Sequence, residues 1–164
     1  MFVTSRPPTW EDRFVLWEDE PLALGTPHHG FFYPDPLGFW GEVRRWAVAL
    51  LAPLEPSWRA DETLSVSAML HVGVDSSRLG RAFALMRPRL VVFLDETAWQ
   101  SSGVALDRRD AHHIRDPHRD GQFYEGFWGV TRDGVVVGKA PHHPAAHKLY
   151  LRADLDGYLR AAPI

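Results

Sequence analysis

The chain of 164 residues contains no cysteine, which excludes disulfides, thiolate zinc sites and cysteine nucleophiles. It also lacks any apolar run long enough to span a membrane. Residues 1–8 contain no apolar core of the kind that a secretory signal needs. We therefore expect a cytoplasmic protein with no membrane partner.

Further absences narrow the chemistry. The sequence has neither a glycine-rich phosphate loop nor a serine nucleophile elbow. Its net charge is −3, so bulk charge does not indicate a nucleic-acid-binding protein, although a local basic face can coexist with an acidic remainder. Apolar residues at 45% and charged residues at 24% are typical of a globular protein. The length predicts a single domain over residues 1–164, and we expect a monomer.

Strand-like and helix-like segments alternate along the chain. The apolar run at 90–94 predicts a central strand buried on both faces. The pattern also predicts a hairpin over 123–140 and an irregular, charged segment over 104–122. Further strands are expected at 14–17, 21–24 and 64–74, and helices at 38–52, about 76–86, 96–101 and 144–159. This alternation predicts an α/β fold, namely a three-layer α/β/α sandwich with a mainly parallel central sheet.

Loops that follow parallel strands meet at one edge of a sheet, where open α/β proteins bind their ligands. Three such loops follow Leu24, Leu94 and Ala140. We therefore expect these loops to converge on one cleft.

The first loop, residues 25–40, is rich in glycine, proline and aromatic residues. Gly25 allows close backbone approach to a ligand, and Thr26 beside it is expected to line the substrate site. Phe32 and Tyr33 suit the wall of a pocket for a planar heterocycle, because stacking and edge hydrogen bonds act together there. The alternative is that these aromatic rings pack the core beneath the loop.

The second loop begins with Asp95, a carboxylate at the end of the central strand, where such groups often face a cleft. The alternative is that Asp95 caps the helix that follows it.

The third loop contains His142 and His143 before Pro144. Proline pushes the preceding residue out of the helical region, which fixes the backbone of His143. An imidazole there can stabilise an anionic leaving group. The alternative is an exposed turn that happens to contain histidines.

Nine histidines also raise the question of a metal site. His143 and His147 have the i,i+4 spacing of helical ligands, and His118 with Asp120 matches the first part of an iron-binding triad. Pro144 breaks the helix that the first pair would need. We expect no metal and no cofactor.

Three segments together resemble the motifs of the uracil-DNA glycosylase superfamily. Residues 30–40, Gly-Phe-Phe-Tyr-Pro-Asp-Pro-Leu-Gly-Phe-Trp, are similar to the first motif of the mismatch and hypoxanthine branches. Residues 87–99 resemble the strand and helix start that follow. The sequence His143-Pro144-Ala145-Ala146 resembles the motif that enters the DNA minor groove.

The resemblance implies a DNA partner and a flipped base stacked on Phe32 or Tyr33. His143 would stabilise the departing base anion, and His28 would position water or replace the missing acid. Asp95 would line the substrate site. The residues implied to contact DNA are Pro144, Ala145, Lys148 and Arg152, with Arg108, Arg109, Arg115, Arg119 and Arg160 as further phosphate contacts or, alternatively, as solvated charges.

The chain departs from the family at three positions. The water-activating acid has no counterpart at 25–28, the base-reading asparagine is missing near 37–38, and Asp95 stands where glycine is usual. Two other hypotheses therefore stay open. One is a non-enzymatic protein-binding module, such as a toxin-neutralising or partner-recognition protein, and the other is a histidine-rich metal-dependent enzyme.

Overall fold

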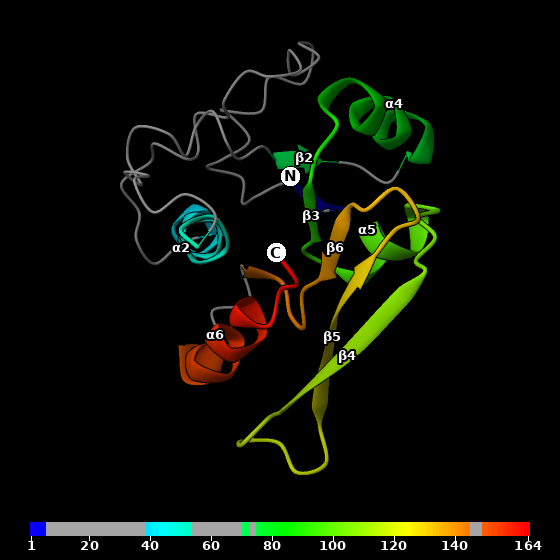
Figure 1. The fold of residues 1–164 in the computed structure, drawn as a ribbon. Coiled ribbons are helices and arrows are strands. Elements are labelled where there is room, and N and C mark those ends of the chain that lie inside the picture. Colours follow the sequence, from blue (N-terminus) through cyan, green and yellow to red (C-terminus); the bar gives the residue numbers. More distant parts are fainter. Residues whose placement is uncertain (6–38, 54–69, 73–74, 145–148) are drawn as a thin grey trace.

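The computed structural model describes residues 1–5, 39–53, 70–72, 75–144 and 149–164 (Figure 1). Six strands in these residues form one sheet in the order β2-β1-β3-β6-β5-β4. The strands are β1 (Phe2–Thr4), β2 (Leu70–Val72), β3 (Leu90–Phe93), β4 (Arg108–Arg115), β5 (Phe123–Val130) and β6 (Val136–Lys139). The helices are α2 (Phe39–Leu51), α4 (Ser76–Met86), α5 (Glu96–Ser101) and α6 (Arg152–Arg160), and a 3-10 turn, η3 (Leu149–Leu151), precedes α6.

The sheet is mixed. Strands β2, β1, β3 and β6 pair in parallel, whereas β5 runs antiparallel to both β6 and β4. The fold is therefore of the α/β class, and the parallel arrangement that the sequence predicts holds for one part of the sheet.

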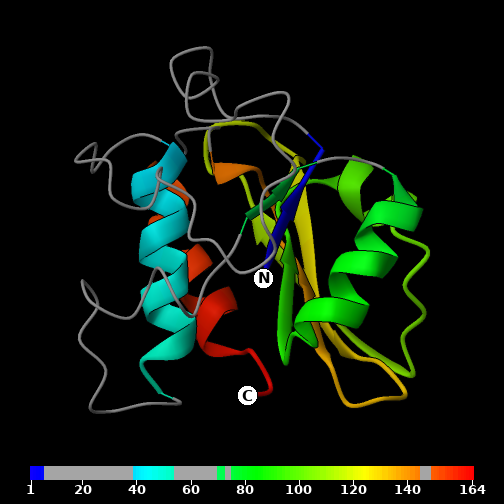
Figure 2. The same ribbon diagram turned by 90° about the horizontal axis from the view of Figure 1, so that it is seen from above.

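Helices lie on both faces of the sheet, as the view in Figure 2 shows. On one face, α2 and α6 pack on Phe2, Val92 and Trp128. On the other face, α4 and α5 pack on Val3, Val91 and Phe93, which alternate with the first set along β1 and β3. This alternation explains why β3 is a continuous apolar run, because both of its faces are buried.

A buried charge cluster joins α2 to α6. Glu42 is 7% exposed and accepts hydrogen bonds from Arg152, Arg45 and the Trp46 indole. Burial acts to raise the pKa of Glu42, but the hydrogen bonds and positive charges of Arg152 and Arg45 outweigh it and lower that pKa. The carboxylate therefore stays ionised in the helix interface.

Several predicted elements are confirmed, among them the helices at 39–51, 76–86 and 96–101 and the hairpin of β5 and β6. The last helix is confirmed from Arg152 onward, with Leu155, Tyr158 and Leu159 buried. The predicted strand at 64–74 is confirmed over β2, while the strands expected at 14–17 and 21–24 lie outside the described residues.

One prediction about order was incomplete, and one strand was not predicted. The segment 104–122 is not irregular throughout, because 108–115 forms β4 along the whole length of β5. Its many charges hid the strand, and they are tolerated because β4 lies at the edge of the sheet, where charged side chains protect against aggregation. The strand that was not predicted is Phe2–Thr4, which forms β1 inside the sheet.

Gly138 in β6 has a packing role that can be tested by mutation. A Cβ atom at this position would overlap the ring of Trp128, which stacks on Tyr158 of α6. We expect Gly138→Ala to lower the free energy of unfolding by about 2 kcal/mol or more, because the ring must shift in a close-packed core. Urea denaturation checks this value.

In the matched control, Gly157→Ala in α6, the new methyl group has open space, and a stabilisation of up to about 1 kcal/mol is expected. Equal effects at the two positions would contradict the packing argument.

Candidate functional site

The carboxyl ends of β1, β3 and β6 meet at one edge of the sheet. The chain runs from β1 to β2 on one side and from β3 to β6 on the other, so the strand order reverses between β1 and β3. In open α/β sheets, ligands bind in the crevice at such a reversal. Thr4 ends β1 and Asp95 follows β3 after one residue, so the two residues face each other across this point.

Asp95 is a carboxylate with a complete set of hydrogen bonds. Its Oδ1 accepts from the Ser5 hydroxyl at 2.7 Å and from the Ala98 amide at 2.8 Å. Its Oδ2 accepts from the Thr4 hydroxyl at 2.9 Å and from the Ser5 amide at 2.8 Å. Because an ionised carboxylate has about four lone-pair sites, these four bonds occupy its acceptor capacity. Asp95 therefore acts as a clamp between β1 and α5 rather than as a free base.

These contacts also determine the charge of Asp95. Burial acts to raise its pKa, whereas the hydrogen bonds from Ser5, Ala98 and Thr4 lower it, and their combined effect leaves the pKa below the ordinary value of 3.8. Asp95 is thus ionised at neutral pH. The two hypotheses for this residue, a helix cap and a group at the cleft, describe one arrangement, because Asp95 caps α5 and also holds the end of β1.

His143 joins this cluster through Thr4. Its Nε2 lies 3.2 Å from the Thr4 hydroxyl oxygen. Thr4 has one hydroxyl hydrogen, and it donates that hydrogen to Asp95, which is ionised and can only accept. The hydroxyl oxygen is therefore the acceptor towards His143, which assigns a hydrogen to Nε2. A chain of contacts thus runs from Asp95 through Thr4 to the imidazole of His143.

The two adjacent histidines have different surroundings. His142 packs between Trp46 of α2 and Tyr124 of β5, with ring centroids 6.2 and 6.4 Å apart, and its Nδ1 lies 3.1 Å from the carbonyl oxygen of His143. His143 is half-buried and contacts the Asp95–Thr4 pair. The geometry therefore separates a packing histidine from a histidine at the sheet edge.

Comparisons of the chain with protein-family models, curated proteins and solved structures found no match.

An ion pair lies beside the cluster of Asp95, Thr4 and His143. Lys139 ends β6, is largely buried, and forms a 2.7 Å ion pair with Glu96, the residue after Asp95. The hydrogen bond from Lys139 lowers the pKa of Glu96. Lys139 also donates to the Glu125 carbonyl at 2.5 Å, so it ties β6 to both α5 and β5.

Other predicted site residues are placed as follows. Pro144 is buried directly after His143. Arg152, predicted to contact DNA, donates to the buried Glu42 at 2.7 Å in this structure. Most of the remaining predicted site residues lie outside the described part of the chain, namely Gly25, Thr26, His28, Phe32, Tyr33, Ala145 and Lys148.

The metal hypothesis finds no support in the described part of the chain, where no group of three or more histidine, aspartate or glutamate side chains is placed to hold an ion. His147 lies outside that part. The described helices also include none that is both long and apolar enough to cross a bilayer.

Sequence reasoning missed Thr4, at the end of β1, and Ser5, directly after it, which both donate hydrogen bonds to Asp95. A signal was present, because Phe2-Val3-Thr4 is an uninterrupted run of residues with high β propensity. A polar residue at the end of such a run marks the carboxyl edge of a strand.

Proposed function

We propose that this protein is a uracil-DNA-glycosylase-like enzyme that binds DNA and excises a damaged or deaminated base at the sheet edge formed by β1, β3 and β6. The observation that carries the proposal is the contact chain from Asp95 through Thr4 to His143 at the point where the strand order reverses. Two of the three loops expected to converge thus contribute residues to one hydrogen-bonded cluster. The proposal also includes the fold, a three-layer sandwich. Because the helices cover the two faces of the sheet, this edge is the place where the ligand would bind.

The role of His143 follows from the direction of its hydrogen bond. Since Nε2–H is donated to Thr4, the ring is held in one orientation at the sheet edge, where in this proposal it meets the departing base. Cleavage of an N-glycosidic bond leaves negative charge on the base, and a donor placed against that charge lowers the barrier. Through Thr4, the ionised carboxylate of Asp95 fixes the orientation of the ring. Asp95 and Thr4 are thus positioning residues, and His143 is the proposed catalytic residue.

The test is a panel of labelled single- and double-stranded oligonucleotides containing uracil, hypoxanthine or a G:T mismatch, incubated with the protein and then cleaved with alkali. We expect strand scission at one of these bases by the wild-type protein and loss of scission in His143→Ala. An absence of scission on every substrate would overturn the proposed base excision, and an absence of salt-sensitive binding as well would favour the protein-binding alternative.

A further inference from the structure

The hairpin of β4 and β5 extends past the sheet edge that holds His143. The last residue of β6, Lys139, pairs with Phe127, whereas the pairing of β5 with β4 continues to Phe123 opposite Arg115. Residues 123–126 and their partners 112–115 therefore overhang the end of β6 by roughly 13 Å, at about 3.3 Å per residue. We call residues 112–126 the arm. Figure 1 shows the arm reaching beyond the other described elements.

The arm is braced rather than loose. Asp116 is 1% exposed, and its Oδ2 accepts hydrogen bonds from the Tyr124 hydroxyl at 2.7 Å and from the Tyr150 hydroxyl at 3.1 Å. Its Oδ1 accepts from the His118 amide at 2.9 Å, which closes the turn at the tip. Tyr150 belongs to η3, so the arm is bonded to the chain that leads into α6.

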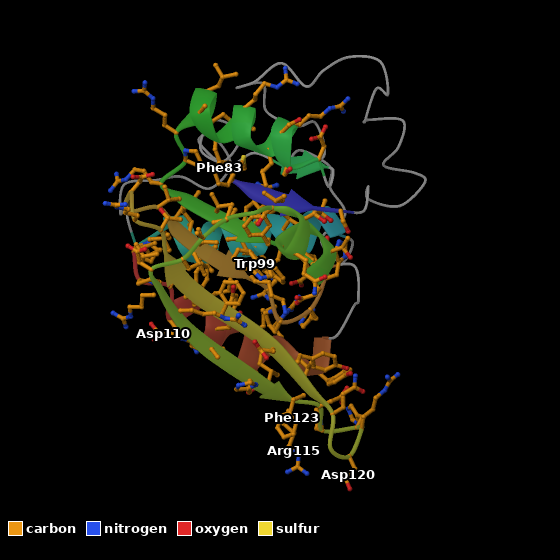
Figure 3. The ribbon with its side chains drawn as sticks, turned by 90° about the vertical axis from the view of Figure 1, so that its right-hand side faces the viewer. Phe83, Trp99, Asp110, Arg115, Asp120 and Phe123 are labelled. Atoms are coloured by element: carbon orange, nitrogen blue, oxygen red, sulfur yellow. The ribbon has the colours of Figure 1, made fainter. Side chains whose placement is uncertain are left out.

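The tip presents an exposed aromatic ring beside two arginines and the exposed Asp120. Phe123 is 57% exposed and lies directly opposite Arg115, while Arg119 belongs to the turn between the strands. Figure 3 shows Phe123, Arg115 and Asp120 together at the far end of the arm, away from Trp99. An exposed aromatic ring beside guanidinium groups is the combination that proteins use to hold bases and phosphates.

The positive charges of the tip are available to a partner. Arg115 pairs with Asp120 at 3.3 Å, but these side chains are 68% and 99% exposed, and such a surface pair contributes little. Arg152 is different, because its carboxylate partner, Glu42, is 9% exposed and would be left buried without its full set of partners. Among the arginines predicted to contact phosphates, those of the tip can exchange their partner at low cost and Arg152 cannot.

We infer that the arm is a DNA-docking element whose tip enters a groove of the duplex, with Arg115 and Arg119 on phosphates and Phe123 against the sugar or base edges. A two-stranded ribbon has the width that the major groove admits. The arm projects from the same edge as His143, so a duplex held by the tip would run past the proposed base site. This inference rests on the proposed function for the identity of the partner as DNA.

The experiment measures the affinity of the whole chain for an undamaged, labelled duplex at several salt concentrations. We expect the double variant Arg115→Ala, Arg119→Ala to bind about tenfold more weakly at low salt, with the slope of log affinity against log salt reduced by about 1 to 2. Phe123→Ala is expected to weaken binding about tenfold with little change in that slope.

Two controls match these variants. Arg78→Ala removes an arginine of similar exposure, 74%, from α4, where it pairs with the exposed Asp75. Leu85→Ala removes an exposed apolar side chain from α4. Both controls should bind like the wild type, and equal melting temperatures will show that all the variants fold.

Each part of the proposal can fail separately. Tip variants that bind like the wild type, or a wild-type protein that does not bind the duplex at all, would overturn the docking role even if base excision is observed. Binding that depends on the tip, with no scission of any base in the oligonucleotide panel, would support the docking role and overturn the glycosylase proposal.

Discussion

Replacing Asp95 by alanine is expected to lower the free energy of unfolding by about 3–5 kcal/mol, because one substitution removes four hydrogen bonds to a charged acceptor. Two of the donors are backbone amides, of Ser5 and Ala98, and they cannot turn towards other acceptors as hydroxyl groups can. Urea denaturation followed by tryptophan fluorescence measures the change.

Asp75 provides the matched control, because it is also an N-cap aspartate. It caps α4 and accepts from the amides of Ser77 and Arg78, but it lies at an exposed position and holds no strand. Asp75→Ala should therefore lower the free energy of unfolding much less than Asp95→Ala, because only the N-cap of α4 is lost. Similar losses in the two variants would mean that Asp95 is a helix cap and nothing more.

The pH dependence of stability gives a second measurement of the same clamp. The pKa of Asp95 is lower in the folded state than in the unfolded chain, so its contribution is present above the unfolded value of about 4. That contribution is lost as the pH falls through the folded pKa. As the pH falls below about 4, we expect the free energy of unfolding of the wild type to decrease more steeply than that of Asp95→Ala. Parallel pH profiles would show that Asp95 does not supply this term.

Replacing His143 by alanine is expected to lower the single-turnover rate of base excision by about 10²–10³-fold, the usual effect of losing a donor aimed at developing negative charge. The measurement is strand scission at saturating enzyme on whichever base the wild type excises. At saturating enzyme, the rate reports the chemical step and not the affinity for DNA. The ring of His143 lies at the sheet edge and not on the arm.

Thr4→Val tests whether the contact chain positions His143. Valine keeps the shape of this fully buried residue but removes the hydroxyl group between His143 and Asp95. We expect a smaller loss of rate, about tenfold, because the ring stays in place without its orienting partner. Arg78→Ala on α4 is the control and should excise at the wild-type rate. For the preceding prediction, a His143→Ala variant that excised the base at the wild-type rate would show that His143 is not a catalytic residue.

The sequence predicted the elements whose patterns are local. The helices at 39–51, 76–86 and 96–101 follow from apolar spacing and caps, and β3 follows from its apolar run. It also predicted that Asp95 and His143 lie at one edge of the sheet. It did not predict β1 or β4, because β1 is three residues long and β4 is a charged edge strand with no alternation of apolar residues. Those two strands supply Thr4 and one side of the arm, so the hydrogen-bond partner of His143 and the proposed docking element both depend on long-range pairing.

Strand β1 ends in the hydrogen-bonded cluster of Thr4, Asp95 and His143, and its place in the sheet also constrains when the protein can fold. β1 has no sheet neighbour until β2 and β3 have been synthesised, and its bond to Asp95 spans 91 residues of sequence. Contacts of such separation form slowly, because the entropy of closing the loop must be lost before they contribute. During synthesis, Phe2–Thr4 therefore has neither of its sheet partners until β2 and β3 have left the ribosome. The proposed active site is complete only after β6 has been made, because His143 follows that strand.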